Sequence, residues 1–108
     1  MDHEILDQRA LAMDRKVAEK LRANPALLVH ARLTRDRWMK TVSPHARPAL
    51  LEWQRILSGP LEGVFIALEG TDEVSTRLRQ SSPFCGILTR EERTKILLEH
   101  RIHESLSA

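Results

Sequence analysis

The chain has 108 residues, of which 42% are hydrophobic and 30% are charged, and its formal net charge at pH 7 is +2. A chain of this length builds a single modest core, which excludes a second domain with its own core. Apolar runs such as 63–68 fall well short of the roughly 20 residues of a membrane-spanning helix. Because the acidic N-terminus lacks the pattern of a secretory signal and Cys85 is the single cysteine, we expect a cytoplasmic protein.

The first predicted helix spans Asp7 to Arg22, where apolar residues recur at helical intervals of three and four. Asn24-Pro25 ends it, because the residue before a proline disfavours the helical conformation. We expect Asn24 to cap a second helix that runs from about Pro25 to Lys40.

The segment 41–50 contains two prolines and predicts a connector into a third helix, which begins near Ser43 or Arg47. Ser58-Gly59-Pro60 ends that helix. The apolar stretch that follows, up to Gly70, has the composition of a buried strand, but no second strand is available to pair with it. We therefore predict a fourth helix there.

A fifth helix is predicted from an N-cap at Thr71 to about Gln80. After a Ser-Ser-Pro-Phe-Cys-Gly break, Thr89 and Glu92 match the capping box of a sixth helix, Arg90 to about Glu104. The sequence therefore predicts an all-α fold, a compact single domain over residues 1–108 with about six mostly short helices and fraying at 1–4 and 105–108.

Residue types that carry catalysis or bind metal do not converge in this sequence. His100 and His103 lie one helical turn apart, but no third ligand has a suitable spacing, so no metal site is predicted. Cys85 has no histidine positioned to activate it and is more simply a small buried residue. We expect neither an enzyme nor a cofactor.

Basic residues are concentrated in the first half of the chain, which has 11 Lys/Arg and 7 Asp/Glu up to Arg55, against 6 and 8 beyond it. The stretch 32–40 contributes Arg32, Arg35, Arg37 and Lys40. These side chains are either ordinary solvated arginines on helix faces or the contacts of a DNA-binding transcriptional regulator. A compact helix-turn-helix with a glycine turn is not recognisable, which weighs against DNA.

The stretch LRQSSPFCGILTREER, residues 78–93, resembles a motif of small bacterial antitoxin-like proteins from two-gene toxin–antitoxin modules. The likeness extends to DRKVAEKLRANPALLVHARLTRDRW and to LLEWQRIL with GPLEGV, and the chain differs in having Cys85 at a position where Ala is expected. The resemblance implies a non-enzymatic protein that binds a toxin, often nucleotidyltransferase-like, and occludes its active site. Such proteins also bind DNA as a complex, and a homo-oligomer is compatible with this resemblance.

The Arg-Gln-Ser-Ser-Pro-Phe box supplies the predicted toxin contacts, which are Arg79, Gln80, Ser81, Ser82 and Phe84. Phe84 would anchor the interface and Arg79 would offer its planar guanidinium to toxin carboxylates. The alternative for Phe84 is that it fills the protein's own core from the loop, which leaves Arg79 and Gln80 available to a partner.

Overall fold

The computed structural model describes residues 2–84 and 86–107, with side chains from 7 to 84 and from 86 to 100. Within these residues it contains six α-helices, one short 3-10 helix and no strand. The elements are α1 (Asp2–Ala23), η1 (Pro25–Leu27), α2 (Leu28–Met39), α3 (Arg47–Ser58), α4 (Leu61–Glu69), α5 (Glu73–Arg79) and α6 (Arg90–Ser107). The all-α prediction is confirmed, including a helix for the apolar segment that could have been a strand.

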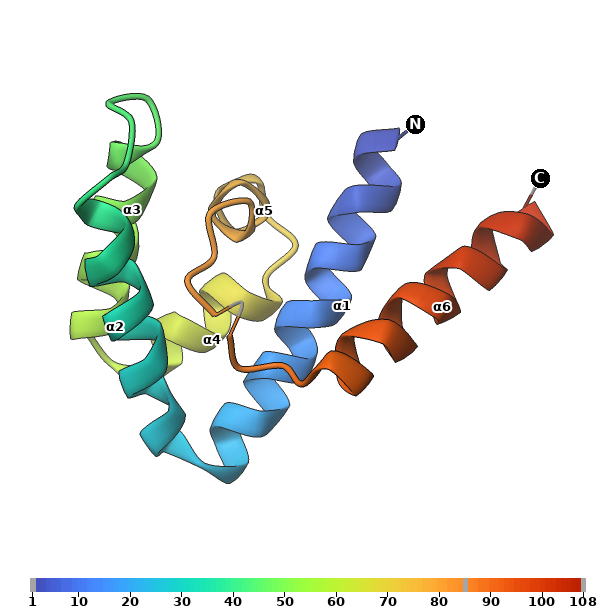
Figure 1. The fold of residues 1–108 in the computed structure, drawn as a ribbon, viewed down its shortest axis with the longest axis horizontal. Coiled ribbons are helices and arrows are strands. Elements are labelled where there is room, and N and C mark those ends of the chain that lie inside the picture. Colours follow the sequence, from blue (N-terminus) through green and yellow to red (C-terminus); the bar gives the residue numbers. More distant parts are fainter. Residues whose placement is uncertain (1, 85, 108) are drawn as a thin grey trace.

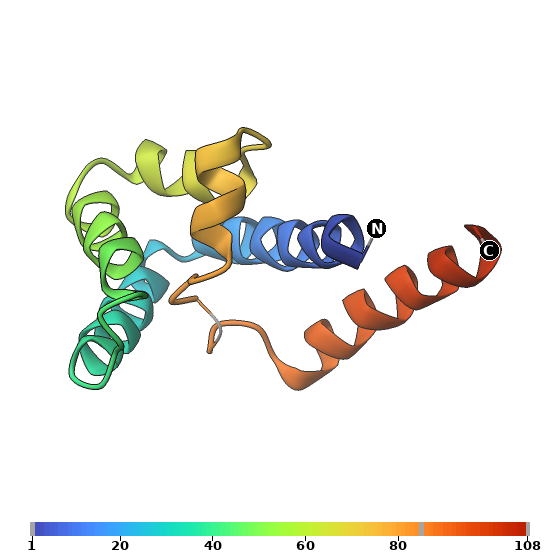
Figure 2. The same ribbon diagram turned by 90° about the horizontal axis from the view of Figure 1, so that it is seen from above.

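α4 contacts three other helices, α1, α3 and α5. α2 and α3 lie side by side at one edge of the molecule, and α5 stands between α3 and α1 (Figure 1). α6 packs against α1 and then extends away from the other helices (Figure 2). α1 begins at Asp2 and α6 ends at Ser107, so both helices continue through the ends that the sequence predicts to fray.

The core is centred on Trp53 of α3, which is fully buried. Its indole Nε1 donates a hydrogen bond to the Leu78 carbonyl oxygen at 3.0 Å, and its ring meets that of Phe84 edge to face with centroids 5.8 Å apart. A buried indole N–H needs such a partner, and the edge-to-face geometry suits two aromatic quadrupoles. This one side chain therefore joins α3, α5 and the loop that follows α5.

Two of the helix caps predicted from the sequence form as expected. The side chain of Asn24 accepts a hydrogen bond from the Ala26 N–H, although the helix it caps is η1, which then leads into α2. Thr89 and Glu92 form the reciprocal capping box, with distances of 3.0 and 2.8 Å between each side chain and the other residue's backbone nitrogen. No helix in the described part of the chain has the length and apolarity needed to cross a bilayer.

The N-cap of α5 is Asp72, one residue later than predicted. Its carboxylate accepts the Ser75 backbone N–H at 3.1 Å and the Ser75 hydroxyl at 2.6 Å. The buried Ser75 hydroxyl also lies 3.2 Å from the Ile66 carbonyl oxygen, which connects the start of α5 to α4. Asp72 is the cap because Ser75 holds its carboxylate at the helix start through two hydrogen bonds.

Candidate protein-binding site around the Arg-Gln-Ser-Ser-Pro-Phe segment

The segment Arg79 to Phe84, hereafter the RQSSPF segment, leaves the end of α5 in successive turns. Backbone N–H groups of Gln80, Ser81 and Ser82 donate to the carbonyls three residues earlier, at 3.2, 3.0 and 3.3 Å. The backbone is therefore held in place by its own hydrogen bonds, and its side chains point to two different sides. The interior side and the surface side have different chemistry.

Arg79 belongs to the interior side, because only 6% of it is exposed. Its Nη1 lies 3.3, 3.5 and 2.6 Å from the carbonyl oxygens of Ala67, Leu68 and Gly70. The last carbonyls of a helix have no partner within the helix and carry partial negative charge, so a buried guanidinium at the end of α4 satisfies them. The expectation that Arg79 offers its guanidinium to a toxin is wrong for this conformation, because α4 already uses it.

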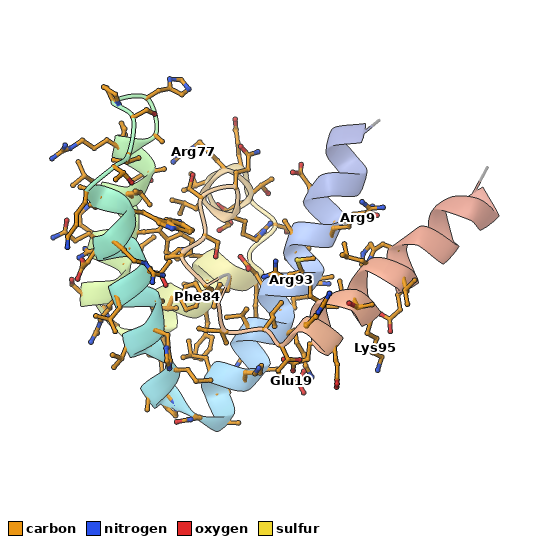
Figure 3. All side chains as sticks on the ribbon, viewed as in Figure 1. Arg9, Glu19, Arg77, Phe84, Arg93 and Lys95 are labelled. Carbon is orange, nitrogen blue, oxygen red and sulfur yellow. The ribbon has the colours of Figure 1, made fainter. Side chains whose placement is uncertain are left out.

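Phe84 also belongs to the interior, with 1% of its surface exposed. Figure 3 shows it inside the molecule among side chains of the surrounding helices, where it contacts Trp53. The prediction that Phe84 anchors an interface is therefore corrected. Phe84 fills the protein's own core from the loop, which is the alternative given in the sequence analysis. A phenyl ring of this size gains more from burial in the core than it would at an open surface.

A small hollow of about 190 Å³, the α1 hollow, lies between α1 and the interior side of the segment. It is lined by Ala10, Met13, Asp14, Val17, Arg79, Gln80, Ser82, Phe84, Leu88 and Arg93. Asp14 is 6% exposed, and its Oδ2 atom has no hydrogen-bond partner among the described residues. Burial raises the pKa of Asp14 to about 7, although the Arg79 charge and a hydrogen bond with Ser82 act in the opposite direction.

Sequence reasoning missed Asp14, although a signal was present. Ala10, Asp14, Val17 and Leu21 are spaced by four, three and four, so the carboxyl occupies the buried stripe of α1. An acid on such a stripe predicts either a buried partner or a raised pKa. Here the nearby guanidinium of Arg79 is directed to the end of α4, and the carboxyl keeps a raised pKa.

A second hollow, of about 350 Å³, lies on the surface side of the segment and is called the α2–α3 hollow. Its lining comes from the end of α2, the following connector, the start of α3 and the end of α5: Trp38, Thr41, Val42, Ala46, Leu50, Gln80 and Ser81. Gln80 is exposed and borders both hollows. Of the five predicted contacts, Gln80 and Ser81 therefore line the α2–α3 hollow, whereas Ser82 lines the α1 hollow, and both serines are half-buried.

The predicted basic stretch does not form a single face. Arg32 donates from Nε and Nη2 to the Leu57 carbonyl oxygen, at 3.3 and 2.8 Å, and so fastens α2 to the end of α3. Arg35 forms an ion pair with Asp36. Arg37 and Lys40 are exposed and adjoin, in sequence, the Trp38 and Thr41 that line the α2–α3 hollow. The structure thus separates the stretch into a half that pairs within the protein and an exposed half that adjoins, in sequence, the lining of the hollow.

Other residues considered from the sequence take structural roles or lie outside the described parts. The Nδ1 atom of His100 lies 2.9 Å from the Ile96 carbonyl oxygen, and the His103 side chain is outside the described residues, as is Cys85. Among the described residues, no group of three or more His, Cys, Asp or Glu side chains is placed to hold a metal ion.

The described residues thus form a small all-α protein with an apolar surface hollow, whose lining adjoins the exposed Arg37 and Lys40 in sequence. No family model, curated protein or solved structure matches the chain.

Proposed function

We propose that this protein is antitoxin-like: it binds a cognate toxin protein and neutralises it by occluding the toxin's active site. The observation that carries the proposal is the position of Gln80 and Ser81 at the edge of the α2–α3 hollow. The segment that resembles the motif of antitoxin-like proteins therefore has the exposed Gln80 and the half-buried Ser81 at a depression of the kind that accepts a partner side chain.

The composition of the hollow supports a protein partner. Trp38, Val42 and Leu50 give it an apolar lining, and the amide of Gln80 and the hydroxyl of Ser81 add polar groups at its edge. Protein interfaces combine a desolvated apolar centre with a polar rim, and tryptophan is enriched among the residues that dominate binding. In this proposal Gln80 and Ser81 contact the toxin directly, while Arg79 and Phe84 hold the segment in shape.

The test is co-expression of this chain with the product of the adjacent gene, with a tag on the neighbour alone. We expect the two proteins to purify as a stoichiometric complex, and we expect growth arrest when the neighbour is expressed without this chain. A harmless neighbour that forms no complex would refute the antitoxin function.

A bulky substitution at the edge of the hollow tests the location of the contact. Ser81→Tyr should weaken the complex by at least about tenfold, since an interface residue that no longer fits costs more than about 1.4 kcal/mol. Ser58→Tyr is the matched control, because Ser58 is exposed at the opposite end of α3 from the hollow. Equal affinities for the two variants would remove the α2–α3 hollow from the interface.

The alternative function is DNA binding by the exposed basic residues. The stretch 37–51 contains Arg37, Lys40 and Arg47 and no acidic residue, which favours an anionic partner of some kind. A DNA-binding regulator would show duplex affinity that falls steeply as salt rises, and charge reversal at Arg37 and Lys40 would abolish it. Absence of duplex binding at low salt would exclude this alternative.

A further inference from the structure

We infer that the α2–α3 hollow binds an acidic segment of a protein, with one large apolar side chain in the hollow and carboxylates on the surrounding cations. The inference rests on the proposed function, because it specifies the chemistry of the toxin surface that this protein recognises.

The shape of the hollow determines what enters it. Leu50 is 2% exposed and forms the floor, while the half-buried Trp38 and Val42 form walls. Its volume of about 350 Å³ is near the lower end of the usual range of pockets, roughly 300–1,000 Å³. That space suits one large side chain of a peptide better than a cofactor, and its lining favours an apolar one.

Polar groups stand at the edge of the hollow. The exposed Gln80 and Thr41 supply an amide and a hydroxyl, and Ser81 supplies a second hydroxyl. An amide side chain both donates and accepts hydrogen bonds, as does a hydroxyl, so these groups match the N–H and C=O of a peptide backbone. A peptide whose side chain fills the hollow would therefore have partners for its main chain.

The charge around the hollow favours an acidic segment. The stretch 37–51, which supplies most of the lining, carries Arg37, Lys40 and Arg47 and no acidic residue. All three of these side chains are exposed. A partner with carboxylates on either side of its apolar residue would gain favourable electrostatics and a faster association rate.

The acidic residues that flank this stretch do not cancel its charge. Asp36, just before it, forms an ion pair with Arg35. Glu52, just after it, accepts from both terminal nitrogens of Arg77 at 3.1 and 2.9 Å, and this pairing holds the pKa of Glu52 below its ordinary value. Each flanking carboxylate therefore pairs with an arginine outside the stretch, and the exposed Arg37, Lys40 and Arg47 keep their charge for a partner.

Nucleic acid would also meet these cations, but the hollow suits it less well. Bases bind to proteins by stacking on open aromatic faces, usually in series along a charged groove. Trp38 is half-buried in a pocket with Val42 and Leu50, and no second aromatic residue lines that pocket. A single recessed apolar pocket matches a peptide anchor more closely, and nucleic acid becomes one outcome of the test.

The experiment is selection of random twelve-residue peptides, displayed on phage, against the folded full chain. We expect the enriched peptides to share one large apolar residue flanked by Asp or Glu. Synthetic copies of the best peptide should bind the wild-type protein at low salt, and their affinity should fall as salt rises.

The double variant Lys40→Glu/Arg47→Glu tests the cations, and Arg90→Glu/Lys95→Glu is its control with the same change of charge. Both members of the control pair are exposed on α6, which leaves the body of the molecule (Figure 2). We expect the first variant to bind the peptide roughly tenfold more weakly, since two exposed ion pairs contribute up to about 1 kcal/mol each, and the control to bind unchanged. Far-ultraviolet circular dichroism and thermal unfolding establish that both variants fold.

The inference would be overturned by enriched peptides without acidic residues, or by equal peptide affinities for the two double variants. It would also be overturned if no peptides were enriched and the wild-type protein bound a labelled oligonucleotide that Lys40→Glu/Arg47→Glu did not bind. Results that refute this inference can be distinguished from results that refute the proposed antitoxin function. A toxin complex that is unaffected by Lys40→Glu/Arg47→Glu removes only the inference. Acidic peptides that bind at the hollow, together with a neighbouring gene product that does not bind, remove only the antitoxin function.

Discussion

Replacement of Asp14 by Asn should make this protein more stable above neutral pH. Burial raises the pKa of Asp14 from 3.8 to about 7, so the folded protein holds this proton more tightly than the unfolded chain does. The stability that results is fully present below about pH 4 and is lost as the pH rises to about 7. Above that range the folded protein must bury a carboxylate whose Oδ2 has no hydrogen-bond partner among the described residues.

The size of the effect follows from the two pKa values. Each pKa unit corresponds to about 1.4 kcal/mol, so a rise from 3.8 to about 7 is worth up to about 4 kcal/mol in the free energy of unfolding. An amide is a neutral isostere of the protonated acid. We therefore expect Asp14→Asn to match the wild type near pH 4 and to exceed it by as much as about 4 kcal/mol near pH 8.

Urea unfolding followed by tryptophan fluorescence at a series of pH values measures the difference directly. Glu92→Gln provides a control of opposite sign, because hydrogen bonds with Lys20 and Thr89 lower the pKa of Glu92 to about 2. The contribution of Glu92 is present above about pH 4 and is lost as the pH falls toward 2, so Glu92→Gln should destabilise the protein at pH 7. If the curves of Asp14→Asn and the wild type stay parallel from pH 4 to about 8, the reasoning about a neutral buried carboxyl is wrong.

The remaining predictions also concern stability, measured by urea unfolding at neutral pH. Arg79→Ala should lower the free energy of unfolding by about 3 kcal/mol, because it leaves buried carbonyls at the end of α4 without a donor; a change below about 1 kcal/mol would contradict that role. Gly63→Ala should stabilise α4 by about 0.5–1 kcal/mol, since nothing lies within 4 Å of the added Cβ. Gly70→Ala should destabilise, because its Cβ would lie 2.6 Å from the Ile66 carbonyl oxygen, and equal effects of the two alanines would refute this contrast. Thr89→Ala should cost about 1 kcal/mol through loss of the cap of α6, and an unchanged stability would argue against the capping box.

The helices of this protein were predictable from local sequence because their ends carry local chemistry. Asn24 before a proline, and Thr89 three residues before Glu92, specify helix starts through hydrogen bonds to backbone N–H groups nearby in the chain. The segment before Gly70 required a further argument, the lack of a partner strand, and it is a helix. Where a capping residue and the backbone group that it binds lie within a few residues of each other, the sequence pattern is enough to predict the helix start.

The candidate site was only partly predictable, because its geometry depends on residues distant in the chain. The resemblance predicted that Arg79 contacts a toxin, whereas a buried arginine needs partners within the protein. Its partners are the carbonyls at the end of α4, 9 to 12 residues earlier, and only the packing of α5 against α4 brings them together. The α2–α3 hollow likewise joins Trp38 to Gln80, which no periodicity connects.

The attachment of α6 has a consequence for hydrogen exchange of the backbone amides. In the described parts of the chain, α6 packs on α1, where the ammonium of Lys20 lies 2.6 Å from the Ile87 carbonyl oxygen and 2.7 Å from a Glu92 carboxylate oxygen. α4, in contrast, packs against three other helices and contributes Val64, Ala67 and Leu68 to the core. We therefore expect the amides of α6 to exchange through a local opening that detaches this helix while the remainder stays folded, and those of α4 to exchange only on global unfolding. On this expectation α6 opens as a unit separate from the five other helices of the described residues.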